Sequence, residues 1–283
     1  MSSQEFDYRK GFVAYPDDSS GASGKKAAYI DHGTESPDPK RYYSQAEADL
    51  EWKHVWMKTW AFAGLAQDLP EVGDYLRYNL GKESFIVVRN ALGERGVKAY
   101  YNVCAHRGNR LVHNDFGHVE DQCFTCDFHG WKYNLDGSNK DIRDEIIFRE
   151  EVVCDRPGMV EVSCDVWNSM IFVNPDPTPR LTLLEHLDVM PEHLKNYDFS
   201  KLRVLRDLEF CWDANWKTAL DAFIEFYHAD VVHPEAIPVS EMLECQYDLY
   251  DNGMSRMIIP QGYVTSRFED RDTVNPFLKM FVE

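Results

Sequence analysis

The stretches "CAHRG" at residues 104–108 and "CDFHGW" at residues 126–131 decide how this chain is interpreted. The first has a cysteine and a histidine two residues apart, the second has them three residues apart, and a glycine follows each histidine closely. Thiolates and imidazoles at such short spacings are typical of metal ligands. The two stretches therefore predict a metal site built from two loops.

The way the ligands divide between the loops favours one kind of metal site. Structural zinc sites usually pair Cys with Cys and His with His at these spacings, whereas here each loop supplies one of each. That division suits a [2Fe-2S] cluster in which two thiolates bind one iron and two imidazoles bind the other. Gly108 and Gly130 would let the backbone pass close to the cluster, where peptide N–H groups can donate to the sulfurs. A zinc-stabilised structural module stays open as an alternative.

Composition and charge exclude several kinds of partner. The chain has 283 residues, with 30 basic and 48 acidic side chains and a net charge of −18. This charge repels phosphate backbones and anionic membrane surfaces, so we expect neither nucleic acid nor a membrane as partner. The start of the chain has no apolar core of signal-peptide length, and no run approaches the length of a membrane span. We therefore expect a cytoplasmic protein whose length suits two domains.

The cysteines outside the two Cys/His pairs are predicted to be structural. The chain has seven cysteines, and an odd number without an export signal argues against a disulfide framework. Cys123 lacks a histidine three residues later, so we expect a packed free thiol. The cysteines without a partner at ligand spacing are predicted to be small buried side chains: Cys154, Cys164, Cys211 and Cys245.

The order of the expected elements predicts an α+β protein in three segments. Residues 1–60 indicate an irregular arm and a helix, residues 61–175 a run of strands, and residues 176–283 helices followed by hairpins. Strands are expected at "FIVVRN" (85–90), "KAYYNVC" (98–104) and "NSMIFVNP" (168–175), helices at 181–197 and 214–230, and hairpins within 245–268. Both Cys/His pairs fall inside the segment of strands.

The stretch "NWKTALDAFIEFYHADVVHPE" (215–235) predicts a second metal site at the end of a helix. An apolar stripe at helical spacing is expected to be buried: Leu220, Phe223, Ile224 and Tyr227. A second stripe lies beside it and favours a site over a merely solvated face: Asp221, Glu225 and His228. His233 is five residues after His228, about 140° out of register on a regular helix, but Pro234 disfavours helical geometry there. We therefore expect both imidazoles to converge, as two ligands of a non-haem Fe(II) facial triad.

The two loops resemble the Rieske family. The pattern "C-x-H-R-G … C-x-x-H-G-W" is similar to the iron-sulfur domain of Rieske-type ring-hydroxylating oxygenases, and the resemblance extends over roughly residues 44–240. It implies a [2Fe-2S] cluster with one iron bound by Cys104 and Cys126 and the other by His106 and His129. The residues expected to surround the cluster are Arg107, Gly108, Gly130 and Trp131.

Departures from the family pattern bear on the loops. The gap between the loops is slightly longer than usual, and Asp127 and Phe128 stand where many members have Pro and Tyr. Respiratory Rieske proteins carry a disulfide between the loops and a serine after the second His-Gly, where this chain has Asn109, Phe128 and Trp131. Fewer hydrogen bonds and no disulfide imply a potential toward the low end of the roughly −150 to +300 mV Rieske range.

The second stretch resembles the mononuclear-iron motif of the same oxygenases, "N-W-K … E/D-x-x-H-x4-H". The resemblance implies that His228 and His233 bind Fe(II), with Asn215 and Asp221 in support. Glu225 takes the position of the acidic residue that links the iron site to the Rieske histidine of a neighbouring subunit. The family's third ligand is an Asp more than a hundred residues further on. The nearby carboxylates do not match it, so we expect a truncated catalytic domain: Glu235, Glu241, Glu244 and Asp248.

Together these resemblances imply the large (alpha) subunit of a Rieske non-haem iron oxygenase. Its expected fold is an all-β Rieske domain inserted in an α+β catalytic domain whose helix-grip-like antiparallel sheet is incomplete here. Such an oxygenase takes electrons from a reductase or ferredoxin and uses O2 at Fe(II) to hydroxylate or oxidatively demethylate an organic substrate. Aromatic or cyclic compounds are favoured, while steroids, quaternary amines and the choice between mono- and dioxygenation stay open.

The expected assembly is a homotrimer, with or without a small beta subunit. The alternative from another class is a Rieske electron-transfer protein, or an inactive fragment, that keeps the cluster without a complete iron site.

Overall fold

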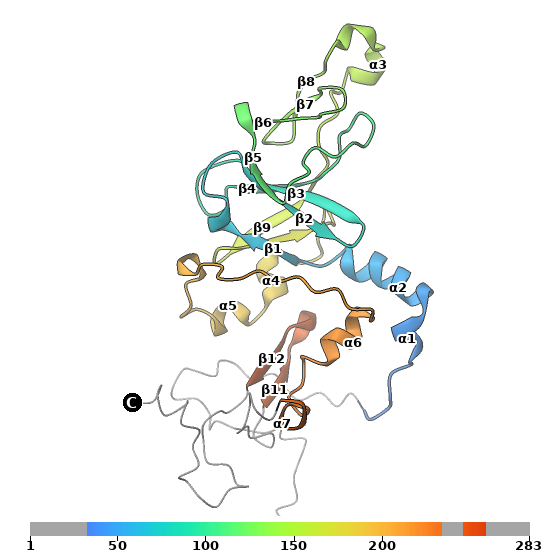
Figure 1. Cartoon of the computed structure of the whole chain (residues 1–283), viewed down its shortest axis with the longest axis vertical. Helices are drawn as coiled ribbons and strands as arrows, with labels where there is room; N and C mark the ends of the chain where they lie inside the picture. Colours follow the sequence, from blue (N-terminus) through green and yellow to red (C-terminus); the bar gives the residue numbers. More distant parts are fainter. Residues whose placement is uncertain (1–32, 234–245, 259–283) are drawn as a thin grey trace, which may run out of the picture. The chain divides into compact units, whose positions relative to one another are not determined.

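A computed structural model describes residues 33–233 and 246–258 of the chain. It divides the chain into two compact units (Figure 1). The first to be described, the sheet unit, comprises Gln45–His186 and Tyr197–Arg206; the other, the helix-hairpin unit, comprises the described residues before 45, residues 187–196 and those from 207 on. In both described ranges, no helix has the length and apolar character that crossing a membrane requires. The domain limits at residues 60 and 175 stay a prediction.

The sheet unit is built on seven antiparallel strands in the order β1-β10-β9-β4-β3-β2-β5. The strands are β1 Ala61–Leu65, β2 Asp74–Leu80, β3 Glu83–Arg89, β4 Val97–Tyr101, β5 Phe116–His118, β9 Glu161–Trp167 and β10 Met170–Asn174. A second, three-stranded sheet contains β6 Cys123–Thr125, β7 Lys132–Asn134 and β8 Asn139–Asp141. The predicted strands at 85–90, 98–104 and 168–175 are thus confirmed as β3, β4 and β10.

Strand β3 explains how the sheet separates two cores. Successive side chains of a strand point to opposite faces. Phe85 and Val87 pack in one buried cluster with residues of β9 and β10, whereas Ile86 and Val88 pack in the other. All four are completely buried, which accounts for the unbroken apolar run in the sequence. The cluster around Ile86 and Val88 also contains both loop cysteines, so the candidate metal site is built on this core.

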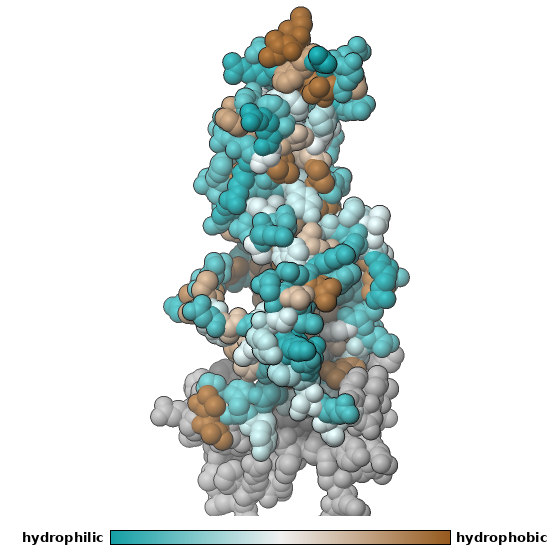
Figure 2. All heavy atoms as spheres, turned by 90° about the vertical axis from the view of Figure 1, so that its right-hand side faces the viewer, coloured by the Kyte–Doolittle hydropathy of each residue, from teal (hydrophilic) through white to brown (hydrophobic). Residues whose placement is uncertain are grey.

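Short helices complete the sheet unit. They are α2 Gln45–Glu51, which continues as the π-helix η2 Trp52–Trp56, then α3 Glu150–Val153 and α4 Leu183–Leu187. The three-residue 3-10 turns of this unit are η3 Ala66–Asp68, η4 Glu120–Gln122, η5 Glu145–Ile147 and η6 Phe199–Lys201. A patch of exposed apolar side chains lies around η5 and α3, seen at the top of Figure 2, and consists of Ile146, Ile147 and Val152.

The helix-hairpin unit has its helices and strands at α1 Lys40–Tyr43, α5 Met190–His193, α6 Trp216–Asp221, α7 Ala229–Val232, β11 Gln246–Leu249 and β12 Ser255–Ile258, with the 3-10 turn η8 Asp251–Gly253. Strands β11 and β12 pair antiparallel, which confirms a hairpin within 245–268. Asp248 is buried there against Arg256, with contacts of 2.6 and 2.9 Å. Glu235, Glu241, Glu244 and Cys245 lie outside the described residues.

The structure corrects two expectations about burial. The helix predicted at 214–230 is interrupted, because Glu225 accepts the backbone N–H groups of Tyr227 and His228 and so replaces the next helical turn. The side chains of its apolar stripe are exposed rather than buried, although Trp212 stacks on one of them, Phe223: Leu220, Phe223, Ile224 and Tyr227. Cys154 and Cys211 are also exposed rather than buried, whereas Cys123 is a buried free thiol as expected.

Candidate metal centres

The two Cys/His loops of the sheet unit have the same backbone turn. Gly108 N–H donates to the carbonyl of Cys104, and Gly130 N–H to that of Cys126, both at 2.9 Å. Each cysteine N–H then donates to the carbonyl of the residue after the glycine, at 2.7 and 2.8 Å. Both glycines adopt left-handed φ, +76° and +77°, which other residues rarely tolerate. The glycines therefore allow two matching loops to project a cysteine and a histidine each.

The four candidate ligands lie together where the loops meet. Cys104 and Cys126 are buried, and the rings of His106 and His129 have centroids 4.6 Å apart. His106 Nδ1 is buried with no hydrogen-bond partner, a costly arrangement that a metal bond would relieve. In residues 33–233 and 246–258, no three His, Cys, Asp or Glu side chains converge on a point that one ion could occupy. One thiolate and one imidazole from each loop are the donor set of a [2Fe-2S] cluster whose ligands are divided between two irons.

Aromatic side chains enclose the histidines. Trp131 stacks on His106 with centroids 4.9 Å apart and planes 11° from parallel, and Phe148 meets the same imidazole edge-on at 6.0 Å. Burial, and then the charges of His129 and Arg107, lower the pKa of His106. The imidazole is therefore neutral near pH 7, which is the form that binds metals. Phe128 packs on His129 at 4.0 Å but is itself exposed, so the second histidine lies near the surface.

Tyr133 is a site residue that the sequence interpretation missed. It is fully buried on β7, and its hydroxyl lies 3.1 Å from Cys104 Sγ and accepts the N–H of Ala105 at 3.1 Å. Burial is the main cause that raises the pKa of Tyr133, so the hydroxyl keeps its proton and can donate it to a thiolate. Its position two residues after Trp131 gave no signal, because the contact depends on how β7 packs beneath the first loop.

The second centre lies in the helix-hairpin unit around the single turn α7. His228 is the N-cap of α7 and His233 its C-cap, where the backbone leaves helical geometry at φ −125° and ψ 47°. The two rings have centroids 5.7 Å apart, so the structure brings both histidines together. Glu225 Oε1 contacts His228 Nδ1, and this bond to the imidazole is the main cause that lowers the carboxyl pKa. The carboxylate thus leaves Nε2 of His228 for a metal, a common outer-sphere arrangement.

The supporting residues Asn215 and Asp221 occupy the two ends of α6. Asn215 is its N-cap and accepts the N–H of Lys217 at 3.0 Å, so its observed contact fixes the start of the helix. Asp221 accepts a hydrogen bond of 2.9 Å from the hydroxyl of Tyr42, a residue of α1 that the sequence interpretation missed. Metal binding by any of these residues stays a prediction.

Known families match both candidate centres. The family of Rieske [2Fe-2S] domains matches residues 59–146, which contain both Cys/His loops. The family described as ring hydroxylating alpha subunit (catalytic domain) matches residues 194–276, which contain His228 and His233. The chain thus matches the Rieske oxygenase alpha subunits in both of their domains. The two domains of this family imply a [2Fe-2S] cluster and a mononuclear iron, and the donor sets described above fit both.

Curated relatives include oxygenases named for different substrates. The chain is 27% identical over 211 residues to the glycine betaine monooxygenase oxygenase subunit of Pseudomonas aeruginosa (strain UCBPP-PA14), covering 73% of this chain and 46% of the relative. It is 28% identical over 207 residues to the carnitine monooxygenase oxygenase subunit of Escherichia coli (strain K12), covering 69% and 52%. It is 26% identical over 207 residues to the biphenyl dioxygenase subunit alpha of Paraburkholderia xenovorans (strain LB400), covering 68% of this chain and 43% of the relative. The chain spans about half the length of these relatives.

Solved structures show the same fold. A quaternary ammonium Rieske monooxygenase in complex with L-carnitine aligns with a TM-score of 0.68 at 22% identity, over 79% of this chain and 62% of that one. A naphthalene 1,2-dioxygenase variant bound to phenanthrene aligns with a TM-score of 0.61 at 24% identity, over 69% of this chain and 44% of that one. The expected architecture of a Rieske alpha subunit, an all-β domain together with an antiparallel catalytic-domain sheet, is confirmed.

Proposed function

We propose that this chain acts as the oxygenase component of a Rieske non-haem iron system that oxidises a quaternary amine. The observation that carries the proposal is the pair His228 and His233 at the two ends of α7, rings 5.7 Å apart, in a chain that also holds a Rieske pocket. When bound, the cluster would supply electron transfer and the mononuclear iron O2 activation. A reductase or ferredoxin would supply the electrons.

The protein's own residues have separate roles in this proposal. Glu225 holds the Nδ1 side of His228 and thereby fixes the ring orientation and its tautomer. Its carboxylate would also connect the iron site to a cluster histidine of a neighbouring subunit in a homotrimer. Phe128 and His129 lie at the surface of the sheet unit, where an electron donor can approach the cluster. The exposed patch of Ile146, Ile147 and Val152, in the same unit, would offer an electron donor further apolar contact area.

The substrate class rests on the names of relatives. Glycine betaine, choline and carnitine monooxygenases each match about 70% of this chain, and all three substrates are quaternary amines. An aromatic hydrocarbon is the competing class, because biphenyl dioxygenase matches at similar identity. An electron-transfer protein is the second candidate function, since no described carboxylate joins His228 and His233 to complete a triad.

A single-turnover experiment on the full chain separates these candidates. The chain is loaded with cluster and Fe(II), reduced, freed of reductant and mixed with O2 and glycine betaine, carnitine or biphenyl. We expect product in proportion to oxidised cluster with a quaternary amine, and none in His228→Ala, which retains the cluster. If biphenyl alone gives product, the substrate is an aromatic hydrocarbon and not a quaternary amine. The cluster could also be reoxidised without product, at the same rate in His228→Ala. That result would favour an electron-transfer protein over an oxygenase.

A further inference from the structure

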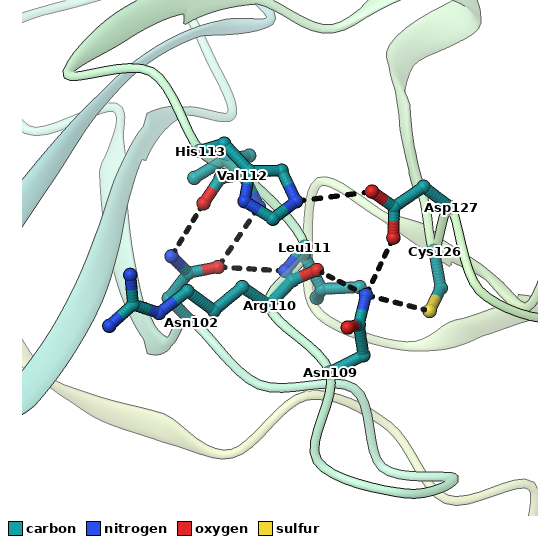
Figure 3. A network of polar contacts seen from close by, with 8 residues as sticks. All are labelled: Asn102, Asn109, Arg110, Leu111, Val112, His113, Cys126 and Asp127. Carbon is teal, nitrogen blue, oxygen red and sulfur yellow. Dashed lines mark hydrogen bonds and ion pairs between the residues drawn. The ribbon is translucent and has the colours of Figure 1, made fainter.

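A side-chain network joins the two cluster loops through residues that are not candidate ligands, and it also reaches the sulfur of Cys126 (Figure 3). Its centre is the amide of Asn109, in the first loop, which donates to Asp127 Oδ1, in the second loop, at 2.6 Å. The same amide nitrogen lies 2.9 Å from the carbonyl of Arg110 and 3.8 Å from Cys126 Sγ. The two N–H groups of this amide therefore donate mainly to the Asp127 carboxylate and the Arg110 carbonyl. The sulfur of Cys126 is a weaker third acceptor, at a distance that is usual for hydrogen bonds to sulfur.

The second oxygen of Asp127 is held as well. Asp127 Oδ2 lies 3.1 Å from His113 Nε2, so each oxygen of the carboxylate contacts a different side chain, Asn109 or His113 (Figure 3). Both of these partners come from the segment that includes the first loop and the residues just after it, whereas Asp127 directly follows the ligand Cys126. The carboxylate is thus a non-covalent cross-link between the loops.

The network is anchored to the sheet by a buried asparagine. Asn102, which directly follows β4, accepts the N–H groups of Leu111 and Val112 at 2.9 and 3.0 Å and donates to the carbonyl of Val112 at 2.8 Å. It is only 4% exposed, so these bonds are shielded from water. They fix the backbone next to His113, and hence the position from which His113 reaches Asp127.

We propose that Asn109 and Asp127 form a clamp that holds the two loops at the separation the cluster requires and that sets the charge beside Cys126. Asn109 and Asp127 are positioning residues, since neither binds iron. The inference rests on the proposed cluster site. The clamp predicts opposite effects on the reduction potential. Asp127→Asn removes a negative charge beside a ligand and should raise the potential, whereas Asn109→Ala removes a donor near the sulfur and should lower it.

The main test measures how fast the full chain loses its cluster. Wild type, Asn109→Ala, Asp127→Ala and the double variant are mixed with an iron chelator, and the visible absorbance of the cluster is followed. Because the carboxylate is largely exposed, we expect each single variant to lose the cluster about three to ten times faster than wild type. The double variant should be no faster than the quicker single variant, because both remove the same cross-link. Additive effects, or unchanged rates, would overturn the clamp.

A matched control separates the clamp from a general effect of surface charge. Asp115→Asn removes an equally exposed carboxylate whose partner is Arg77, on β2, and should leave both the loss rate and the potential unchanged. Potentials that shift in the same direction in Asn109→Ala and Asp127→Asn would also contradict the proposal.

The clamp can fail independently of the proposed function. If the wild-type chain binds no cluster, the proposed function fails, while the hydrogen bonds of the cluster-free protein still predict lower unfolding temperatures for Asn109→Ala and Asp127→Ala than for the wild-type chain. Unfolding temperatures equal to that of the wild-type chain would overturn the clamp.

Discussion

Replacing Tyr133 by phenylalanine tests whether the protein tunes the cluster through a single hydrogen bond. The hydroxyl lies 3.1 Å from Cys104 Sγ in a fully buried position, so water cannot replace it. A hydrogen bond to a charged acceptor contributes about 1.5–3 kcal/mol. Reduction adds an electron to the cluster and strengthens the bond. If a third to a half of its energy is specific to the reduced state, about 0.5–1.5 kcal/mol is lost, which lowers a one-electron potential by roughly 20–60 mV.

The same substitution has a second, independent consequence. The N–H of Ala105 loses its acceptor, the Tyr133 oxygen, which costs about 1 kcal/mol of folding free energy. Potentiometric titration therefore measures the change in potential, and thermal unfolding measures the change in stability. Tyr100→Phe is the matched control, because Tyr100 is equally buried and its hydroxyl donates to the Leu135 carbonyl rather than to a sulfur. It should lose stability without changing the potential. An unchanged potential in Tyr133→Phe with the cluster retained would refute the reasoning, and so would an equal shift in the control.

Three further predictions concern ligation, the second centre and pH. His106→Cys should retain a cluster at a lower potential in voltammetry, because a thiolate donates more charge than an imidazole; a raised potential would contradict the ligand assignment. Asn215→Ala should destabilise the chain by about 1 kcal/mol in denaturant unfolding, whereas Asn215→Asp, which keeps an N-cap acceptor, should not. Asp176 accepts from Lys58 at 2.7 Å, and this bond is the main cause that lowers its pKa, so its stabilisation is present above its unfolded pKa of about 4 and is lost as pH falls through the folded value. Asp176→Asn should therefore cost about 0.5–1 kcal/mol at neutral pH and progressively less as pH falls through the folded pKa, and a cost that does not change with pH would show that the charge is irrelevant.

The parts of the fold and sites that the sequence predicted are those with local causes. Strand β3 followed from an unbroken apolar run, and the matching loops from glycines that occupy positive φ behind each Cys/His pair. The convergence of His228 and His233 followed from the proline after the second histidine. In each case, residues close together in the sequence carried the signal.

The residues that sequence interpretation missed depend on long-range packing. Tyr133 reaches Cys104 across 29 positions of the chain, and Asn109 reaches Asp127 across 18, so no local pattern predicts either contact. The helix expected at 214–230 failed for a different, local reason. Its apolar spacing predicted a continuous helix, but the side chain of Glu225 accepts backbone N–H groups that a continuous helix would use itself.

The analysis of iron and acid-labile sulfide in the purified chain tests the central claim most directly. A [2Fe-2S] cluster held by Cys104, His106, Cys126 and His129 predicts about two sulfides and at least two irons per chain. Cys126→Ser should abolish the sulfide, whereas Cys123→Ser should retain it, because Cys123 is a buried free thiol three residues before the ligand. Zinc bound by the wild-type chain without acid-labile sulfide, or equal sulfide in both variants, would contradict the account.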